Sequence, residues 1–333
     1  MLALVTGSTG FIGSHLCRAL LEKGWSVRAF HRPSSPFNLI EDLDVERVEG
    51  DLNRPESLLP AVEGAAVIFH CAAAMSSRTR QRSQLYITTV EGTRYILQAA
   101  RISGVQRVIY TSAAAALGIP ERSPICEPSP GFLLNENHTW NGVPNIWPFG
   151  YSKYQAELEV QRATAKGLDV VSVNPTQVIG PGDLHRQTRS LVVQVAARKL
   201  PFLIHIGINI VPVADVVAGH LAALEHGQRG ARYILGGHNL TLADYATRIA
   251  AAAGVEPPAI TLSNGLAQRL PVLLRIINRF VRSPFDPSQL RLSGRCLYYS
   301  NDRAQSNLHL DAPRPLDTAI NESLEWFRQA GAI

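Results

Sequence analysis

Three glycines near the start of the chain have a spacing that suits phosphate binding. Gly7, Gly10 and Gly13 form a G-x-x-G-x-x-G pattern after a short apolar run and at the start of an amphipathic stretch. In a strand–turn–helix unit the first glycine allows a tight turn, the second lets the backbone approach a pyrophosphate, and the third permits close helix–sheet packing. The helix N-terminus then presents free N–H groups and a partial positive charge to the anion. The pattern therefore predicts a dinucleotide site.

Residues beyond the glycine turn indicate which dinucleotide binds. The second apolar run ends in Phe30-His31-Arg32, with no carboxylate to hold the two ribose hydroxyls that NAD offers. Arg32 could bind a 2′-phosphate instead, so the site favours NADP(H) over NAD(H). The alternative is that Arg32 is only a solvated arginine at a strand end. Asp51 and Leu52 are placed to meet the adenine ring.

The elements that must position these residues alternate between apolar runs and helical patterns, which is typical of βαβ units and a parallel sheet. We expect helices over Phe11–Lys23 and over 151–166, each followed by a glycine that suits a helix C-terminus. Strands are predicted at Leu2–Thr6, Ser26–His31, Val45–Glu49, Val67–Cys71, Arg107–Thr111 and Val170–Asn174, with a last sheet-like run at Arg232–Leu235. The predicted fold class is α/β, a Rossmann doubly wound parallel sheet with a smaller, mostly helical C-terminal substrate domain.

Length and composition limit the architecture and the partners. The chain has 333 residues, 46% hydrophobic and 18% charged, as expected of two globular domains. We place the Rossmann domain at 1–176 plus 211–236 and the substrate domain at 177–210 plus 237–333. The net charge of +5 is mild, and the one basic cluster, 78–82, is short, so nucleic acid is not an expected partner. No apolar run is long enough to span a bilayer.

The four cysteines, Cys17, Cys71, Cys126 and Cys296, are far apart and form no C-x-x-C pair. This spacing excludes a zinc knuckle and argues against a disulfide framework, so we expect no metal site and a reducing, cytoplasmic location. No signal peptide is expected either, because the first apolar run leads straight into the glycine turn.

Matches to a known family extend over essentially the whole chain. The matching stretches are Val5–Gly13, Gly50–Leu52, Phe69–Ala73, Gly92-Thr93, Tyr110–Gly118, Ser152-Lys153 with Ala156-Glu157, Asn174-Pro175 through Gly180–Asp183, Val213–Val216 and Leu316–Phe327. On these residues the sequence resembles the extended (atypical) short-chain dehydrogenase/reductases of the NAD(P)-dependent epimerase/dehydratase family, in the dihydroflavonol-reductase-like branch. The resemblance implies an NAD(P)-binding Rossmann domain, a small-molecule substrate held under the C-terminal domain, and, by analogy, a homodimer. The expected cofactor-binding residues are Gly7, Thr9, Gly10, Phe11, Ile12, Gly13, Arg32, Asp51, Leu52, Ala72, Ala73, Lys153, Pro175 and Val178.

The catalytic set that the resemblance implies is incomplete in this chain. In the family a tyrosine exchanges a proton during hydride transfer, a serine or threonine holds the substrate oxygen, and a lysine four residues after the tyrosine shares its helix face. Lys153 occupies the lysine position, but Phe149 occupies the tyrosine position and Ala113 the serine position. A position that often carries a supporting asparagine holds Thr89.

Three neighbouring residues are candidate replacements. Tyr151 lies two residues before Lys153, roughly 200° around the helix, and should face away from the cofactor. Ser112 precedes Ala113 on a strand, so it should point to the opposite face and make a structural hydrogen bond. His185 is a speculative replacement acid because histidine titrates near neutrality, and its alternative is a surface or structural role.

The missing groups decide how the function is interpreted. A positioned acid–base group contributes roughly 10²–10⁴ in rate, and one oxyanion donor about 10²–10³. Cofactor binding is therefore expected, whereas ordinary hydride transfer is not. One hypothesis is an NADP(H)-linked reductase or epimerase for a small carbonyl or hydroxyl substrate, with water or His185 as proton donor. The others are a non-redox cyclase, lyase or isomerase, and a catalytically silent cofactor-binding module. Deliberate replacement of tyrosine and serine to trap a ligand is a fourth interpretation, which Thr89 weighs against.

One segment hints at an apolar substrate. Residues 270–282 read as a short amphipathic basic helix, with Arg275, Arg279 and Arg282 on one face. Such a helix could line an apolar substrate entrance or lie weakly on a membrane surface. Packing within the C-terminal domain explains the pattern equally well.

Overall fold

The computed structural model describes residues 1–74, 82–123, 126, 133–183, 190–269 and 290–333. His185, the segment 270–282 and most of the basic cluster 78–82 lie outside the described residues, so the predictions made for them stay predictions.

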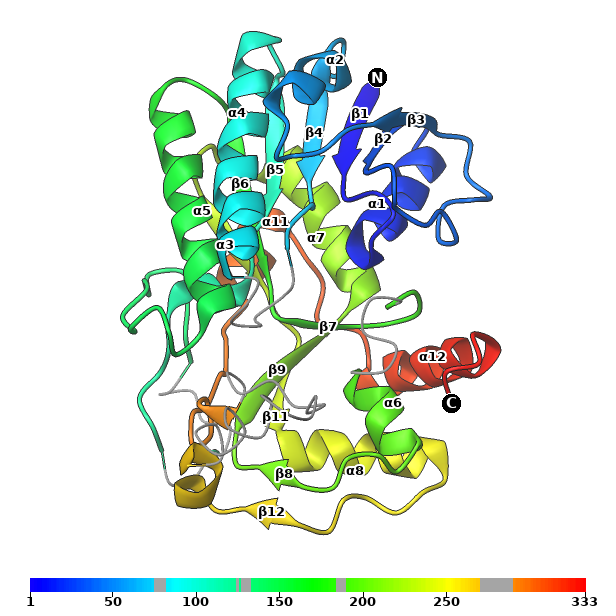
Figure 1. The fold of residues 1–333 in the computed structure, drawn as a ribbon, viewed down its shortest axis with the longest axis vertical. Helices are drawn as coiled ribbons and strands as arrows, with labels where there is room; N and C mark the ends of the chain where they lie inside the picture. Colours follow the sequence, from blue (N-terminus) through cyan, green and yellow to red (C-terminus); the bar gives the residue numbers. More distant parts are fainter. Residues whose placement is uncertain (75–81, 124–125, 127–132, 184–189, 270–289) are drawn as a thin grey trace.

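A seven-stranded parallel sheet organises the first part of the chain (Figure 1). Its strand order is β10-β6-β5-β4-β1-β2-β3. The strands are β1 (Leu2–Thr6), β2 (Ser26–His31), β3 (Glu46–Glu49), β4 (Val67–His70), β5 (Arg107–Thr111), β6 (Val170–Pro175) and β10 (Arg232–Leu235). This doubly wound α/β arrangement confirms the predicted fold class.

Helices cover both faces of this sheet. They and the shorter turns that connect them are α1 (Phe11–Glu22), η1 (Pro55–Ser57), α2 (Leu58–Val62), α3 (Arg82–Tyr86), the π-helix η3 (Ile87–Glu91), α4 (Gly92–Ile102), η4 (Ala114–Leu117), α5 (Pro148–Ala165), α7 (Val213–His226) and α11 (Asp302–Leu308). One apolar core lies between the sheet and α2, α4 and α5, and another lies between the sheet and α1, α7 and α11. Because both faces are covered, the central strands are buried along most of their length, which is why their sequences read as continuous apolar runs.

The predicted element boundaries agree with the structure to within a few residues. Four predicted strands, β1, β2, β5 and β10, have the expected limits. The second helix was expected to begin at Tyr151, but α5 begins three residues earlier, at Pro148. Proline is suited to the first helical turn because its missing N–H has no partner there in any case.

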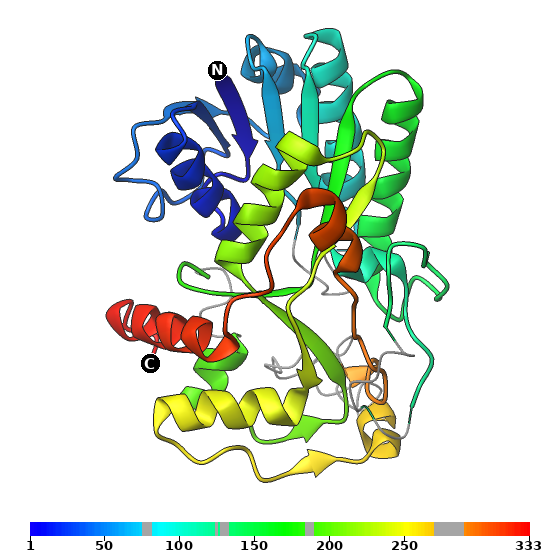
Figure 2. The ribbon, with the colours of Figure 1, turned by 180° about the vertical axis from the view of Figure 1, so that it is seen from behind.

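The rest of the chain forms a second layer beyond the carboxyl ends of the strands (Figure 2). It contains β7 (Gln177–Ile179), α6 (Leu191–Ala196), β8 (Leu203–Ile204), β9 (Gly207–Pro212), β11 (His238–Thr241), α8 (Leu242–Ala253), β12 (Thr261–Leu262) and α12 (Leu316–Gln329). β11, β9 and β7 form one sheet, and β12 and β8 form a second. The expectation of a mostly helical part therefore missed two small sheets. Most of their strands have two to four residues, and the longer β9 is buried along its whole length, so none shows a clear alternating pattern.

The cysteine prediction was wrong on one point. Cys126 and Cys296 form a disulfide across a sequence separation of 170 residues, whereas Cys17 and Cys71 are free thiols. The sequence could not indicate this pair, because only the fold brings two positions so far apart into contact.

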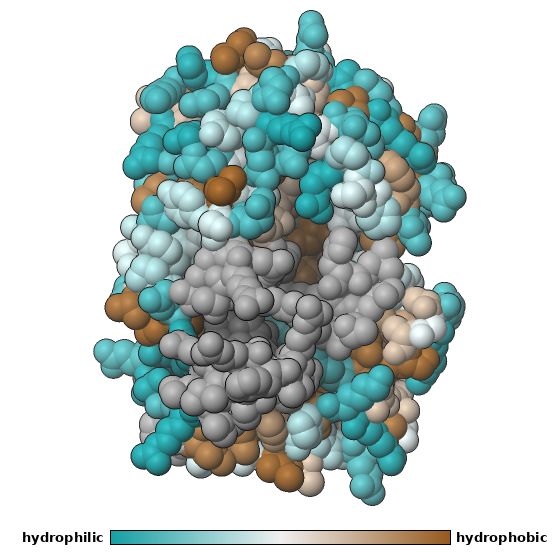
Figure 3. Space-filling view, viewed as in Figure 1, coloured by the Kyte–Doolittle hydropathy of each residue, from teal (hydrophilic) through white to brown (hydrophobic). Residues whose placement is uncertain are grey.

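In Figure 3 hydrophilic residues cover most of the coloured surface in the upper part of the view, with apolar residues between them. Several large apolar residues, such as Leu59 and Ile102, are exposed, as is normal for a globular surface. Among the described helices, none is both long enough and apolar enough to cross a membrane.

Candidate functional site

The glycine turn lies between β1 and α1, and its geometry requires glycine. Gly7 has a φ of +69°, and a Cβ there would lie 2.9 Å from the backbone of Ala72, which follows β4. A Cβ at Gly13 would lie 2.2 Å from the carbonyl oxygen of Gly7. A side chain at Gly7 would therefore push the turn away from the end of β4, and one at Gly13 would push α1 away from the turn.

The N-terminus of α1 is open to an anion. Its capping residue, Gly10, supplies no side-chain hydrogen bond, and no acidic residue lies in the first turn. The N–H groups at Phe11 and Ile12 are therefore without a capping side chain, which leaves the positive end of the helix dipole available to a phosphate.

Arg32 follows β2 directly and is exposed. No ion pair or hydrogen bond from its guanidinium occurs among the described residues, unlike Arg28 on the same strand, which pairs with Glu46 at 2.9 Å. Asp51 follows β3, where its side chain accepts a hydrogen bond from the N–H of Asn53 at 2.9 Å. Leu52 is buried, and a Cβ on Gly92 would come within 2.9 Å of it.

A buried histidine fixes the backbone beside the glycine turn. His70, at the end of β4, is fully buried, with Nδ1 at 2.7 Å from the Thr6 hydroxyl and Nε2 at 3.1 Å from the Thr93 hydroxyl. The Thr93 hydroxyl donates to the carbonyl of Thr89 at 2.6 Å, so it must accept from Nε2–H of His70. Nδ1 then accepts from Thr6, whose oxygen accepts the N–H of Ala72 at 3.3 Å.

The charge on His70 follows from this pattern. Both ring nitrogens are hydrogen-bonded, Nε2 as a donor and Nδ1 as an acceptor, so the ring carries one proton. Burial lowers the pKa of His70 to about 3. His70 is therefore neutral, and it orients the strand ends rather than transferring a proton to a substrate.

Lys153 lies on α5 under the carboxyl end of β5. Its side chain is buried, and Nζ donates a hydrogen bond to the carbonyl of Thr111 at 2.7 Å. Burial lowers the pKa of Lys153 to about 8. Thr111 also contacts a free thiol, because its hydroxyl lies 3.2 Å from the sulfur of Cys71. Burial raises the pKa of the Cys71 thiol to about 11. Nζ has further N–H donors besides the one bound to the carbonyl, so it could also bind a ribose hydroxyl.

A second buried histidine is also committed to its neighbours. His220 on α7 donates from Nδ1 to the carbonyl of Val216 at 2.7 Å and accepts at Nε2 from the Thr111 hydroxyl at 2.8 Å. Burial lowers the pKa of His220 to about 4. Like His70, it is neutral and held in place.

The two substituted positions lie where the chain turns from β5 and where α5 begins. Ala113 follows β5 and precedes η4, and Phe149 lies in the first turn of α5. Both side chains are half-buried, whereas the η4 residues after Ala113 are buried. Neither alanine nor phenylalanine carries an exchangeable proton. Thr89 lies in the π-helix η3, and its buried hydroxyl has no hydrogen-bond partner among the described residues.

Two of the weighed replacements have other partners. The hydroxyl of Ser112 donates to Glu157 at 2.5 Å, which confirms the expected structural hydrogen bond. Tyr151 packs against Trp140 with ring centroids 5.5 Å apart, so its ring belongs to an aromatic cluster at the start of α5. Pro175 ends β6, and Val178 lies in β7, the first strand beyond the large sheet.

Comparisons with known proteins match the chain to a family. The family model for "NAD dependent epimerase/dehydratase family" matches residues 3–236. The chain belongs to this family. A curated relative named "Putative dihydroflavonol 4-reductase", from Synechocystis sp., is 33% identical over 99% of this chain and 95% of its own length. "Sterol demethylase protein B" from Methylococcus capsulatus is 32% identical over 100% of both chains. The solved structure named gox2253 superimposes with a TM-score of 0.86 at 35% identity, covering 100% of this chain and 99% of the other.

The family is described as NAD dependent, and the residues present in the Rossmann sheet and its connections fit an NAD(P) cofactor. The open end of α1, the close approach of Gly7 to Ala72 and the anchored Lys153 suit the phosphates and a ribose. A structure of MoeE5 with UDP-glucose and NAD shares the fold, with a TM-score of 0.76 at 22% identity.

Sequence reasoning missed the buried ionic support of this site. Glu157 accepts from Ser112 and also from Asn174 at 2.6 Å, and its other oxygen pairs with Arg232 at 2.9 Å. The Asn174 amide also donates to the carbonyl of Ala113 at 3.1 Å, so the network holds the serine position. The only available signal was that these polar residues lie within or beside otherwise apolar runs.

Proposed function

We propose that this chain binds NADP(H) and acts on a small, apolar carbonyl or hydroxyl compound, using a catalytic centre without the tyrosine–serine pair. The observation that carries the proposal is a contrast within one site. Lys153 is buried and anchored, yet the half-buried Phe149 and Ala113 beside it offer no proton and no hydrogen bond. The expected cofactor residues and the division into two domains at 176/177, 210/211 and 236/237 are part of this proposal.

The cofactor preference rests on Arg32. An exposed guanidinium without a partner among the described residues is suited to a 2′-phosphate, because arginine binds phosphate with a planar fork of donors. No carboxylate stands at the end of β2 to hold the ribose hydroxyls of NAD instead.

The substrate class rests on the relatives and on the site itself. Relatives are named "Sterol demethylase protein B", "Dihydroflavonol 4-reductase" and "3-beta-hydroxysteroid dehydrogenase", and these names refer to ring compounds that are largely apolar. Phenylalanine and alanine at the two substituted positions make the wall of the site more apolar than tyrosine and serine would. A homodimer and a cytoplasmic location remain predictions.

The chemistry divides between the cofactor and the chain. When bound, the nicotinamide supplies or accepts a hydride. Lys153 would hold the ribose, and the neutral His70 fixes Thr6 and Ala72, beside which the cofactor would pass. Because both buried histidines are neutral and committed, we infer that the substrate proton is exchanged with water or with His185.

A direct test combines cofactor titration with a turnover assay. We expect NADPH to bind more tightly than NADH, and NADPH to be oxidised slowly with a panel of 3-ketosteroids and flavanone-type carbonyls. Absence of nicotinamide binding would reject the proposal outright. Tighter binding of NADH would reject the assignment of Arg32.

A non-redox cyclase, lyase or isomerase is the second candidate, and the absence of a proton-donating side chain at positions 113 and 149 favours it. In that case product forms from a substrate while the cofactor absorbance at the reduced-nicotinamide band stays constant. Stoichiometric NADPH oxidation would exclude it. Binding of NADPH without any product across both assays would instead indicate a silent cofactor-binding module.

A further inference from the structure

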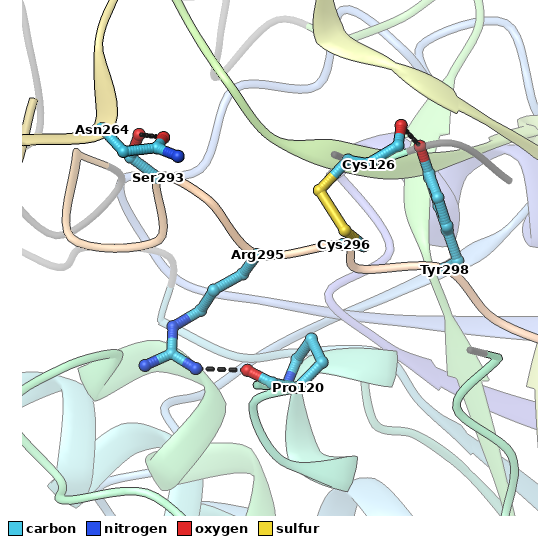
Figure 4. Close-up of a disulfide and its surroundings, with 7 residues drawn as sticks. All are labelled: Pro120, Cys126, Asn264, Ser293, Arg295, Cys296 and Tyr298. Carbon is cyan, nitrogen blue, oxygen red and sulfur yellow. Dashed lines mark hydrogen bonds between the residues drawn. A yellow bond between two sulfur atoms is a disulfide. The ribbon is translucent and has the colours of Figure 1, made fainter. Parts of the chain in front are cut away.

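The Cys126–Cys296 disulfide joins two segments that lie 170 residues apart in the sequence (Figure 4). Cys126 comes from the segment that follows η4, and Cys296 is bridged to Gly207 at the start of β9. We propose that this disulfide is a redox modification site. Its reduction by a dithiol loosens the join, that is, the contact between the segment after η4 that carries Cys126 and the segment that carries Cys296, and leaves the nicotinamide site intact.

Hydrogen bonds accompany the disulfide along the same join. Ser123 donates to the carbonyl of Gly294 at 2.7 Å, and Leu134 donates to the carbonyl of Tyr298 at 2.9 Å. The Tyr298 hydroxyl donates to the carbonyl of Cys126 at 2.8 Å. These contacts hold the two segments in register, but each is a single hydrogen bond of modest net value.

A pair of like charges opposes the join. Arg122 and Arg295 face each other in an antiparallel bridge, and like charges directly opposite each other destabilise strand pairing. Burial, together with the charge of Arg122, lowers the pKa of the Arg295 guanidinium. In Figure 4 Arg295 extends towards Pro120, on the side away from the sulfur of Cys296. The disulfide therefore offsets a repulsion that acts one residue away from Cys296, and opening it leaves only the hydrogen bonds between the two segments to oppose that repulsion.

The join is connected to the substituted catalytic positions by short contacts. The side-chain amide of Asn141 binds both backbone groups of Ile119: Oδ1 accepts from the N–H at 2.8 Å, and Nδ2 donates to the carbonyl at 3.0 Å. η4 packs against the first turn of α5, where a Cβ on Gly150 would lie 2.6 Å from the carbonyl of Ala115. A shift after η4 would therefore reach the wall formed by Ala113 and Phe149. The glycine turn, in contrast, is held by β1, β4 and α1.

The exchange reaction is balanced by an external dithiol. Cys126 is half-buried and Cys296 is buried, so the thiolate of the dithiol attacks the sulfur of Cys126 and Cys296 leaves as a thiolate. The second thiol of the reductant then displaces Cys126 and closes a ring disulfide. Each cysteine has gained one electron and one proton, and the dithiol has lost two of each. In reducing compartments such disulfides are usually transient and redox-sensing.

The test uses amide hydrogen exchange of the full chain before and after treatment with dithiothreitol. In the wild-type protein we expect exchange at the amides of Ser123 and Leu134 to rise by at least about tenfold on reduction, because a long-range restraint is lost. The Cys126→Ser/Cys296→Ser variant is the matched control and should exchange fast with or without dithiothreitol. The NADPH dissociation constant should change by less than about twofold in all four samples.

Several results would overturn the inference. One is the absence of a cross-linked 126–296 peptide from oxidised wild-type protein in non-reducing mass spectrometry, and another is amide exchange that stays unchanged on reduction. An equal response to dithiothreitol in the double variant would also overturn it, as would a large change in NADPH affinity. Failure of the proposed function is distinguishable, since it appears as no NADPH binding in any redox state, whereas exchange and cross-linking need no cofactor.

Discussion

Replacement of Arg32 by alanine should selectively weaken the binding of NADPH. The guanidinium is exposed, so its interaction with a 2′-phosphate takes place close to the dielectric limit of water. Two unit charges about 4 Å apart in water attract by about 1 kcal/mol. A phosphate carries a charge of about −1.5 to −2 at neutral pH. The expected loss is therefore about 1.5–2 kcal/mol, which corresponds to roughly a 10- to 30-fold rise in the NADPH dissociation constant.

The assay is a fluorescence titration with NADPH and NADH at two salt concentrations. For Arg32→Ala, NADH affinity should stay within about twofold of wild type, and the NADPH deficit should shrink in high salt because exposed charges are screened. Arg101→Ala removes the same charge from an exposed position at the far end of α4 and should change neither affinity. Equal losses for both cofactors, or a loss of NADPH affinity in Arg101→Ala, would refute the assignment of Arg32.

Three further predictions concern the catalytic centre and the disulfide. Because the pKa of Lys153 is lowered to about 8, the unfolded chain binds this proton more tightly than the folded chain from about pH 8 to 10.5. Over that window the wild-type free energy of unfolding should therefore rise with pH relative to Lys153→Met in urea titrations; a constant difference would contradict the lowered pKa. The double variant Phe149→Tyr/Ala113→Ser should reduce the carbonyl panel about 10²–10⁴ times faster if the pocket is shaped for hydride transfer; a folded, NADPH-binding variant with no gain would show that it is not. A disulfide that closes a loop of 170 residues stabilises the folded chain by at most about 5 kcal/mol through chain entropy, so Cys126→Ser/Cys296→Ser should lower Tm by up to about 7 °C. Scanning calorimetry should find the same decrease in reduced wild-type protein, and a difference in Tm between reduced wild type and the variant would contradict this.

The large sheet could be predicted because its strands are buried on both faces. The run Leu2–Val5 is wholly apolar, because helices cover both faces of the sheet and no side of the strand faces water. In the second layer, β8 has only two residues, and β9, although six residues long, is buried throughout, so neither shows alternation. The predicted start of α5 was three residues too late for a different reason. Proline usually interrupts a helix, so Pro148 indicates a break unless it is placed in the first helical turn.

The candidate site was assigned from the resemblance to the family, and its proton states were not predicted. The resemblance, together with the i, i+4 spacing on one helix face, assigned Lys153, Phe149 and Ala113 to the family's catalytic positions, and their roles remain predictions. That His70 is neutral follows only from the donor and acceptor roles of Thr6 and Thr93, which meet it from other elements. The disulfide needs tertiary contact for the same reason.

The catalytic substitutions remove chemistry without harming the scaffold, and burial explains why. Phe149 and Ala113 are half-buried, so a hydroxyl at either position would not be fully removed from solvent, and its loss has a small cost in stability. The buried network behind them, in which Glu157 accepts from both Ser112 and Asn174, remains complete at its carboxylate. Among the described residues, the Thr89 hydroxyl and the Oδ1 of Asn174 are buried without a hydrogen-bond partner. Restoring a tyrosine and a serine should therefore change the reaction far more than the stability, whereas changing Thr89 should affect stability as well.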